Sequence, residues 1–178
     1  MLTSFTIQEC NNEIVNDILF INSLSYPTTW EYSDARNYYC QLLQKKSTIS
    51  IFLKDRDKNI GYLVAIPHDD AVVELIDDDP EMADDSNRYY VESVAIIPEY
   101  RGRKGLNEIF RTLSRELAKK GISQISLHAR VSNNLSRIIQ HKAHVTKLRR
   151  IVAWRYYNYD EPAEYIEANL FPEQKWES

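Results

Sequence analysis

The segment from Arg88 to Asn107, RYYVESVAIIPEYRGRKGLN, constrains the fold more than any other part of the chain. An apolar run, Val91 to Ile97, stops at Pro98, a short basic loop with two glycines follows, and an amphipathic segment begins at Leu106. This order predicts a strand, a tight cationic turn and a helix. Backbone N–H groups and the helix dipole at such a turn suit a pyrophosphate. The alternative is an ordinary connection whose basic side chains only face water.

The sequence of this loop, VAIIPEYRGRKGL, resembles the acyl-CoA pyrophosphate loop of the GNAT superfamily of N-acetyltransferases. The family form is an apolar strand followed by V-x-P-E-Y-R-G-K-G-I-G, and Pro98 to Gly102 match it in order and spacing. The chain then has Arg103 to Asn107, RKGLN, in place of K-G-I-G, which is one residue longer and ends in Asn. Helical spacing of the apolar residues supports an insertion; these residues are Leu106, Ile109, Phe110, Leu113 and Leu117.

The resemblance implies an α/β fold, the GNAT acyl-CoA N-acyltransferase fold, with a central mixed, mostly antiparallel sheet flanked by helices. We expect a single domain over 1–178, with 158–178 as a C-terminal appendage of uncertain form. Residues 68–87 are acidic and are expected to be irregular. The other patterns predict strands at Thr3–Gln8, Thr48–Leu53, Ile60–Ile66, Ser123–Ala129 and Arg150–Tyr157, and helices after Asn11, at Ser33–Lys45, from the loop to Lys120 and from Asn133 or Asn134 to about His141.

Composition describes an ordinary soluble protein, with 43% hydrophobic and 27% charged residues among 178. The net charge of −4 argues against a general nucleic-acid binder. Cys10 and Cys40 lie far apart and form no CxxC motif, and two isolated cysteines are typical of a protein from a reducing compartment. The sequence has no recognisable signal peptide and no apolar run of roughly 20 residues, so a cytoplasmic protein without a membrane segment is expected.

Acetyl transfer from a thioester to an amine needs a group that takes the proton of the amine. Glu92 is the candidate base, because a carboxylate inside an apolar strand is expected to have a raised pKa. In several amine acetyltransferases of the superfamily, a Glu four residues before the V of V-x-P relays this proton through water, and Glu92 has that place if Ile96 stands for the V. The alternative is a carboxylate on the sheet that pairs with a neighbouring cation.

The acid for the leaving thiolate is less evident. Many family members have a Tyr on the helix after the fifth strand, in a pattern like N-x-x-A-x-x-L-Y-E-x-x-G-F. Here Asn133, Ser136 and Ile139 follow that pattern, but Gln140 stands where the Tyr would be. We take Tyr157, in the C-terminal YYNY segment, as the candidate acid. His141, a neighbouring tyrosine of that segment, or no acid at all are the alternatives.

The resemblance also implies a cofactor site for acetyl-CoA as co-substrate, and we predict no metal. The strand residues are expected to bind the pantetheine arm, because a splayed strand leaves N–H and C=O groups for an amide-bearing ligand. The loop residues are expected to surround the pyrophosphate, and Asn133 to approach the arm. These cofactor-binding candidates are Val94, Ala95, Ile96, Arg101, Gly102, Arg103, Lys104, Gly105, Leu106, Asn107 and Asn133.

Two charged segments flank these motifs. The segment from Asp69 to Asp85 carries nine carboxylates and no Lys or Arg, and an acidic rim there would attract a cationic amine. The alternative is a solvated loop kept soluble by like charge. The basic stretch from Arg137 to Arg155 would face the adenosine end of CoA or pair with the acidic segment, and binding of nucleic acid is the less favoured interpretation.

The predicted function is an N-acetyltransferase that moves an acetyl group from acetyl-CoA to a primary amine by direct attack in a ternary complex. The acceptor is expected to be a small cationic amine, a lysine or an N-terminal amine, on a small molecule or a peptide. The alternative is a GNAT-fold protein that binds CoA or a protein partner without turnover. A homodimer is possible on either interpretation.

Overall fold

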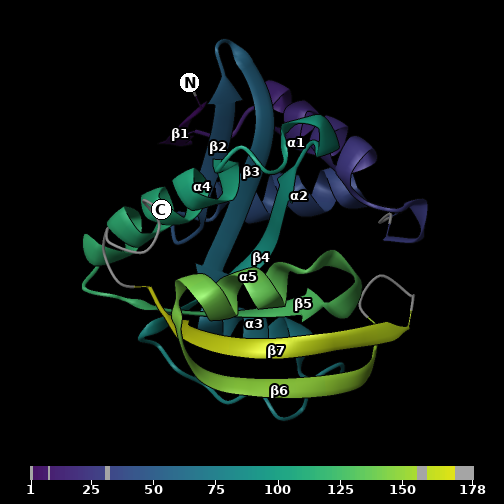
Figure 1. The fold of residues 1–178 in the computed structure, drawn as a ribbon, viewed down its shortest axis with the longest axis vertical. Helices are drawn as coiled ribbons and strands as arrows, with labels where there is room; N and C mark the ends of the chain where they lie inside the picture. Colours follow the sequence, from purple (N-terminus) through teal and green to yellow (C-terminus); the bar gives the residue numbers. More distant parts are fainter. Residues whose placement is uncertain (1, 8, 31–32, 156–159, 171–178) are drawn as a thin grey trace.

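The computed structural model describes residues 2–7, 9–30, 33–155 and 160–170. A twisted sheet of seven strands runs through the molecule in the order β1-β2-β3-β4-β5-β7-β6 (Figure 1). All neighbouring strands are antiparallel except β4 and β5, which are parallel. The strands are β1 (Leu2–Thr6), β2 (Ile49–Asp55), β3 (Lys58–Pro67), β4 (Arg88–Ile96), β5 (Gln124–Arg130), β6 (His144–Trp154) and β7 (Glu161–Asn169).

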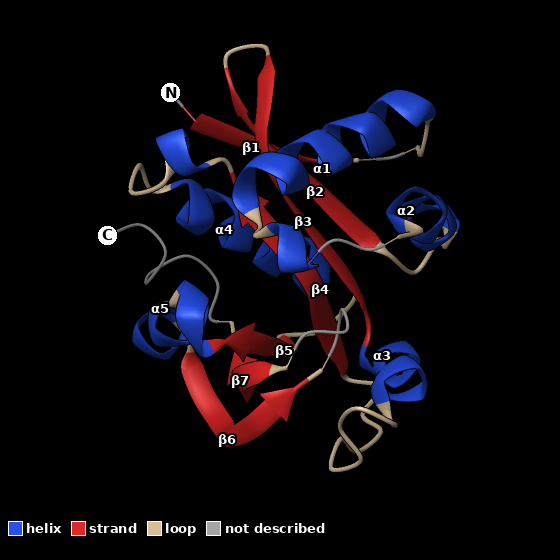
Figure 2. Cartoon of the chain, turned by 90° about the vertical axis from the view of Figure 1, so that its right-hand side faces the viewer, coloured by secondary structure: helices blue, strands red, loops and turns tan. Residues whose placement is uncertain are grey.

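Helices cover both faces of the sheet. Figure 2 shows α1, α2 and α3 on one side and α4 and α5 on the other. The helices are α1 (Asn12–Ser25), α2 (Ala35–Gln44), α3 (His68–Leu75), α4 (Gly105–Ala118) and α5 (Leu135–Lys142). This is the α/β architecture that the sequence predicts, a mixed and mostly antiparallel sheet flanked by helices. In the described part of the chain, each helix is too short or too polar to cross a bilayer.

Two helices show how the sequence sets their ends and faces. The side chain of Asn11 accepts a hydrogen bond from the Ile14 N–H at 2.9 Å and caps α1. Helix α4 buries an apolar stripe of Ile109, Phe110, Leu113 and Leu117 completely against the sheet. Gly121 follows this helix with φ 72°, the left-handed conformation that glycine adopts at low cost. Both ends that the sequence predicts by capping chemistry are therefore confirmed.

The structure differs from the sequence-based expectations in three segments. Residues 68–75, expected to be irregular, form α3. Strand β6 begins at His144, six residues before the predicted start. Residues 161–169, in the segment left as an appendage of uncertain form, form β7, which lies inside the sheet between β5 and β6.

Candidate active site

The site is organised by a gap in the middle of the sheet. Strands β4 and β5 pair only where Arg88, Tyr89 and Tyr90 meet Gln124, Ile125 and Ser126. Beyond Tyr90 the two strands separate, so the backbone of the second half of β4 is not bonded to β5. Two cavities lie along this gap, and five residues line both of them: Tyr26, Trp30, Val94, Asn133 and Leu135.

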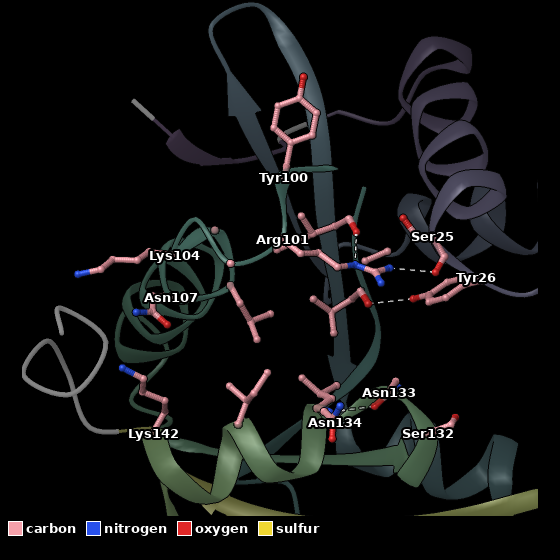
Figure 3. Close-up of a pocket in the computed structure, with 18 of the residues that line it drawn as sticks. Ser25, Tyr26, Tyr100, Arg101, Lys104, Asn107, Ser132, Asn133, Asn134 and Lys142 are labelled. Carbon is pink, nitrogen blue, oxygen red and sulfur yellow. Dashed lines mark hydrogen bonds between the residues drawn. The ribbon is translucent and has the colours of Figure 1, made fainter. Parts of the chain in front are cut away.

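The larger cavity has a volume of about 730 Å³, a size typical of small-molecule sites. Its walls are the end of β4, the loop that leads into α4, the segment after α1 and one face of α5 (Figure 3). Among the described residues that line it are three cations, Arg101, Lys104 and Lys142, and no carboxylate. The cavity therefore offers positive charge at one end and an apolar strand edge at the other.

The positive end is the first turn of α4. Lys104 precedes this helix in a left-handed conformation with φ 61°, and its side chain makes no capping hydrogen bond to the described part of the helix. The amides of Gly105, Leu106 and Asn107 belong to the first turn of the helix, where backbone N–H groups point toward the helix end. Lys142 extends from α5 toward this turn (Figure 3). Amides, helix dipole and lysines together form a suitable anion site.

Gly105 has a packing role of its own. A Cβ atom at this position would lie 2.6 Å from Leu53 Cδ2 and 3.3 Å from Ile96 Cδ1. The start of α4 therefore sits directly on β2 and β4, and a larger residue at this position would displace the Leu53 side chain. The extra residue of the loop is accommodated ahead of Gly105, where Lys104 takes the left-handed conformation.

Two basic residues of the loop are directed away from the anion site. The Arg101 guanidinium donates to the carbonyl oxygens of Ile96 at 2.9 Å and Ser25 at 3.0 Å (Figure 3), which ties the loop to β4 and to α1. The Arg103 guanidinium lies 5.2 Å from the centre of the Tyr100 ring, and Arg103 does not line the cavity. Of the predicted cofactor-binding residues, all except Arg103 line the larger cavity.

The open edge of β4 carries further contacts. The Tyr26 hydroxyl donates to the Val94 carbonyl at 2.9 Å. Burial raises the pKa of Tyr26 well above its usual value, so the phenol is neutral across the physiological range. Tyr26 also packs on the Trp30 ring, with ring centres 5.5 Å apart. Sequence analysis did not single out either residue, because an aromatic pair after a helix reads as core packing.

The smaller pocket, of about 70 Å³, contains the predicted base. Val64 pairs with Ser93 and Ala65 with Val91, so Glu92 is the extra residue of a β-bulge in β4. Bulges re-aim a side chain and are common beside active sites. The Tyr38 hydroxyl donates to Glu92 Oε1 at 2.5 Å, which fixes the carboxylate in the pocket.

Hydroxyl groups beside the bulge hold it in place. The Tyr62 hydroxyl donates to Asn22 Oδ1 at 2.5 Å. The Tyr39 hydroxyl lies 3.0 Å from the Tyr62 hydroxyl. Tyr39 also donates to the hydroxyl of Ser93 at 3.4 Å. These side chains come from α1, α2, β3 and β4 and are largely buried, so they link four elements around Glu92.

A second polar chain lies on the β5 side of the smaller pocket. His128 Nε2 donates to Asp79 Oδ2 at 2.9 Å, because a carboxylate only accepts. His128 Nδ1 lies 2.9 Å from the Tyr90 hydroxyl and accepts from it when the ring is neutral. Burial lowers the pKa of His128, which favours this neutral form. The imidazole also stacks on the Trp154 ring, with ring centres 3.9 Å apart.

Part of the acidic segment turns inward rather than forming a rim. Asp79 is buried, and its carboxylate also accepts from Arg149 on β6. Hydrogen bonds from His128 and Arg149 lower the pKa of Asp79 to about 2, against the effect of its burial. Asp85 pairs with Arg88 at 2.9 Å. The expectation that the basic stretch pairs with the acidic segment is confirmed for Arg149.

The structure gives the position of Gln140 on α5, while the candidate acid Tyr157 lies in a segment that it does not describe. Gln140, where the family pattern has Tyr, is exposed and donates to Ser136 Oγ at 3.0 Å. The residues of α5 that line the larger cavity are Leu135, Ile138 and Lys142. Tyr157 lies outside the described residues. The sequence offered no signal for His128 beyond a histidine within a predicted strand.

Comparison with known proteins agrees with this geometry. The model of the Acetyltransferase (GNAT) family matches residues 15–139, whereas no curated protein sequence matches. Arabidopsis thaliana NAA60, solved in complex with acetyl-CoA, has TM-score 0.68 at 13% identity, covering 94% of this chain and 97% of its own. The aminoglycoside 6'-N-acetyltransferase of Enterococcus faecium has TM-score 0.65 at 12% identity, with 96% and 98% covered.

A third solved structure is a spermidine N-acetyltransferase chimera from Vibrio cholerae and hSSAT. It has TM-score 0.63 at 15% identity and covers 94% of this chain and 95% of its own. At such identities these neighbours share the fold, while the family match spans more than half of the chain. With its splayed strands, glycine-containing loop and α4 N-terminus, this chain belongs to the GNAT acetyltransferase family.

Proposed function

We propose that the protein transfers an acetyl group from acetyl-CoA to a primary amine by direct attack in a ternary complex. The observation that carries this proposal is the pair of cavities that meet where β4 and β5 separate. The larger cavity suits a long anionic cofactor, and the smaller one contains a carboxylate. A thioester at their junction would meet an amine that enters from the opposite side.

Acetyl-CoA would lie in the larger cavity. Its pyrophosphate would bind the amides of Gly105, Leu106 and Asn107, with Lys104 and Lys142 nearby. Its pantetheine arm would follow the edge of β4 from Ile96 to Val94, where backbone amide groups can pair with the ligand. The Arabidopsis thaliana NAA60 structure, which shares the fold, was solved in complex with acetyl-CoA, and this supports the assignment.

The acceptor amine would enter the smaller pocket. Glu92, aimed by the bulge and held by Tyr38, would take the proton of the attacking amine through a water molecule. The amine nitrogen then bonds to the acetyl carbon, the carbon–sulfur bond breaks, and its electron pair goes to the CoA sulfur. Donors at the open edge of β4 would stabilise the charge that develops on the thioester oxygen.

The acceptor is proposed to be cationic in solution. The Glu92 carboxylate lines the smaller pocket and would favour an ammonium group, while Arg130 and His128 in the same pocket pair with Glu161 and Asp79. Two of the solved neighbours are named for polycationic acceptors, an aminoglycoside and spermidine, whereas another is named for the alanine of ribosomal protein S18. A cytoplasmic location, expected from the sequence, would supply acetyl-CoA.

The test is a turnover assay with acetyl-CoA and a panel of amines that includes a polyamine, an aminoglycoside, a lysine peptide and an N-terminal amine. We expect CoA release and an acetylated product, identified by mass spectrometry, for at least one amine. Glu92→Gln should lower kcat by about 10²- to 10⁴-fold near neutral pH and recover partly at higher pH, where the amine is already neutral. Glu116→Gln, which removes a carboxylate paired with Lys119 on α4, is the matched control.

The second candidate function is a protein that binds CoA without turnover. The position of Gln140, exposed and bonded back to Ser136, favours it because α5 then presents no tyrosine to the cavity. Binding of acetyl-CoA with no product from any class of amine would support this alternative. An active wild type whose rate is unaltered by Glu92→Gln would instead show that Glu92 is not the base.

A further inference from the structure

We propose that the Tyr26 hydroxyl is the hydrogen-bond donor for the leaving sulfur of CoA, in the role that Gln140 does not fill. This inference rests on the proposed function, because it requires acetyl-CoA in the larger cavity. It assigns to the segment after α1 a catalytic contact that the family pattern would place on α5.

The position of Tyr26 supports the assignment. Tyr26 lines both cavities, so it lies at their junction, where the thioester must meet the amine. Its hydroxyl donates to the carbonyl of Val94, 2.9 Å away, on the open edge of β4 (Figure 3). An arm that runs along β4 from the α4 turn brings its sulfur to this carbonyl. A small rotation of the phenol O–H would direct it from Val94 to the sulfur.

The other residues at the junction are less suitable. Val94 and Leu135 have no polar side chain. Asn133 is exposed, and its side-chain oxygen accepts from the Leu135 N–H at 2.9 Å, which anchors it to the start of α5. The Trp30 ring lies under the Arg130 guanidinium at 4.8 Å, a contact that fixes the ring plane. Tyr26 is therefore the residue of the five whose donor is directed at the strand edge.

The proton balance closes with a donor that keeps its proton. When the carbon–sulfur bond breaks, the electron pair stays on the sulfur, and the amine proton passes through water to Glu92. The thiolate leaves hydrogen-bonded to Tyr26 and takes its proton from solvent, and Glu92 releases its proton to solvent. Burial and the nearby Tyr39 and Glu92 keep the Tyr26 phenol protonated throughout this sequence. A preorganised donor of this kind stabilises the charge that forms in the transition state.

Tyr26→Phe removes the hydroxyl and leaves the ring. The matched control is Tyr89→Phe, which also loses a hydroxyl bonded to a backbone carbonyl, that of Ser47 at 3.0 Å, and which lines neither cavity. The first readout is turnover with the best amine. We expect kcat to fall at least about tenfold for Tyr26→Phe, with KM for acetyl-CoA unchanged.

The second readout needs no turnover. Calorimetric titrations at about pH 9 compare CoA, whose thiol is partly ionised there, with desulfo-CoA, which lacks the sulfur. The wild type and Tyr89→Phe should bind CoA about tenfold more tightly than desulfo-CoA, and Tyr26→Phe should bind both equally. Desulfo-CoA binding also reports whether the variant has kept its fold.

The outcomes separate the two proposals. A wild type that binds no CoA defeats the proposed function itself. A wild type that binds and turns over, together with a Tyr26→Phe variant that still favours CoA over desulfo-CoA, overturns the role of Tyr26 alone. Loss of this preference in Asn133→Ala with retention in Tyr26→Phe would assign the sulfur contact to Asn133 instead.

Discussion

Lys104 combines backbone strain with a useful charge. As a non-glycine residue at φ 61° it costs about 1 kcal/mol, and it brings an ammonium group to the start of α4. Lys104→Gly should therefore raise the free energy of unfolding by about 1 kcal/mol, measured by denaturant titration. The substitution should also weaken the binding of acetyl-CoA by up to about fivefold, since an exposed ion pair contributes up to about 1 kcal/mol.

Arg56 provides the matched control for this prediction. It has φ 56° in the exposed two-residue turn between β2 and β3, and it lines neither cavity. Arg56→Gly should stabilise the fold to a similar extent and leave the affinity for acetyl-CoA unchanged. If both variants weaken binding equally, the lysine charge has no role in the anion site.

The same scale shows which site residues a sequence can identify. The residues predicted to bind the pyrophosphate follow one another in the chain, so the sequence shows their spacing, and the structure places all of them except Arg103 on the larger cavity. Glu92 was identified by its distance from the loop, but the bulge that aims it depends on the register with β3. Tyr26, His128 and Asp79 come together from separate elements, so no local pattern links them.

At the scale of elements, α3 and the acidic segment after it are fastened by a buried histidine. His68 Nε2 donates to the Ala83 carbonyl at 3.0 Å, which leaves Nδ1 to accept from the Ser126 hydroxyl at 2.7 Å. Burial is the main cause that lowers the pKa of His68, with the Arg88 charge adding to it. The neutral imidazole makes both contacts, and the lowered pKa of His68 favours this form in the fold.

This arrangement predicts a loss of stability on mild acidification. The unfolded chain protonates His68 and His128 near their usual pKa of about 6.5, whereas the folded chain resists because both pKa values are lowered. The free energy of unfolding should therefore fall as pH decreases through about 6.5. Asp79 adds a second loss as pH falls from about 4 toward 2, because its pKa is lowered in the fold.

Denaturant titrations at pH 7.5 and 5.5 measure the first effect. His68→Gln should reduce the dependence on pH, and His141→Ala, which alters an exposed histidine on α5, should leave it as in the wild type. Equal stability of the wild type at the two pH values would contradict the account of both buried histidines.

Two of the segments that differ from the sequence-based expectations, β7 and the first half of β6, depend on pairing with neighbouring strands. Strand β7 contains Pro162 and three glutamates among nine residues, a weak strand pattern. It forms because β5 and β6 pair with it on both sides. Strand β6 alternates between exposed and partly exposed residues, several of them basic, so its early half gave no apolar signal. The sequence predicted helix α4, by contrast, because the apolar residues that it buries recur at helical spacing within the helix itself.

At the scale of the whole molecule, the parting of β4 and β5 opens the sheet between two cavities, where we propose that the substrates bind. The proposed anion site lies at the α4 turn on one face, and the proposed acceptor side lies at α1, α2 and the bulge on the other. The cofactor and the amine are expected to approach from different faces and meet at the strand gap. The sequence predicted the sheet and the loop, while the two-sided junction required the structure.

The central claim is that the larger cavity binds acetyl-CoA, and calorimetric titration of the purified protein with acetyl-CoA tests it most directly. We predict one site per chain with micromolar affinity, weakened by added salt because the pyrophosphate meets the α4 turn and two lysines. A titration with 3′-dephospho-CoA separates the contribution of the terminal phosphate. No heat and no binding at millimolar acetyl-CoA would contradict the account.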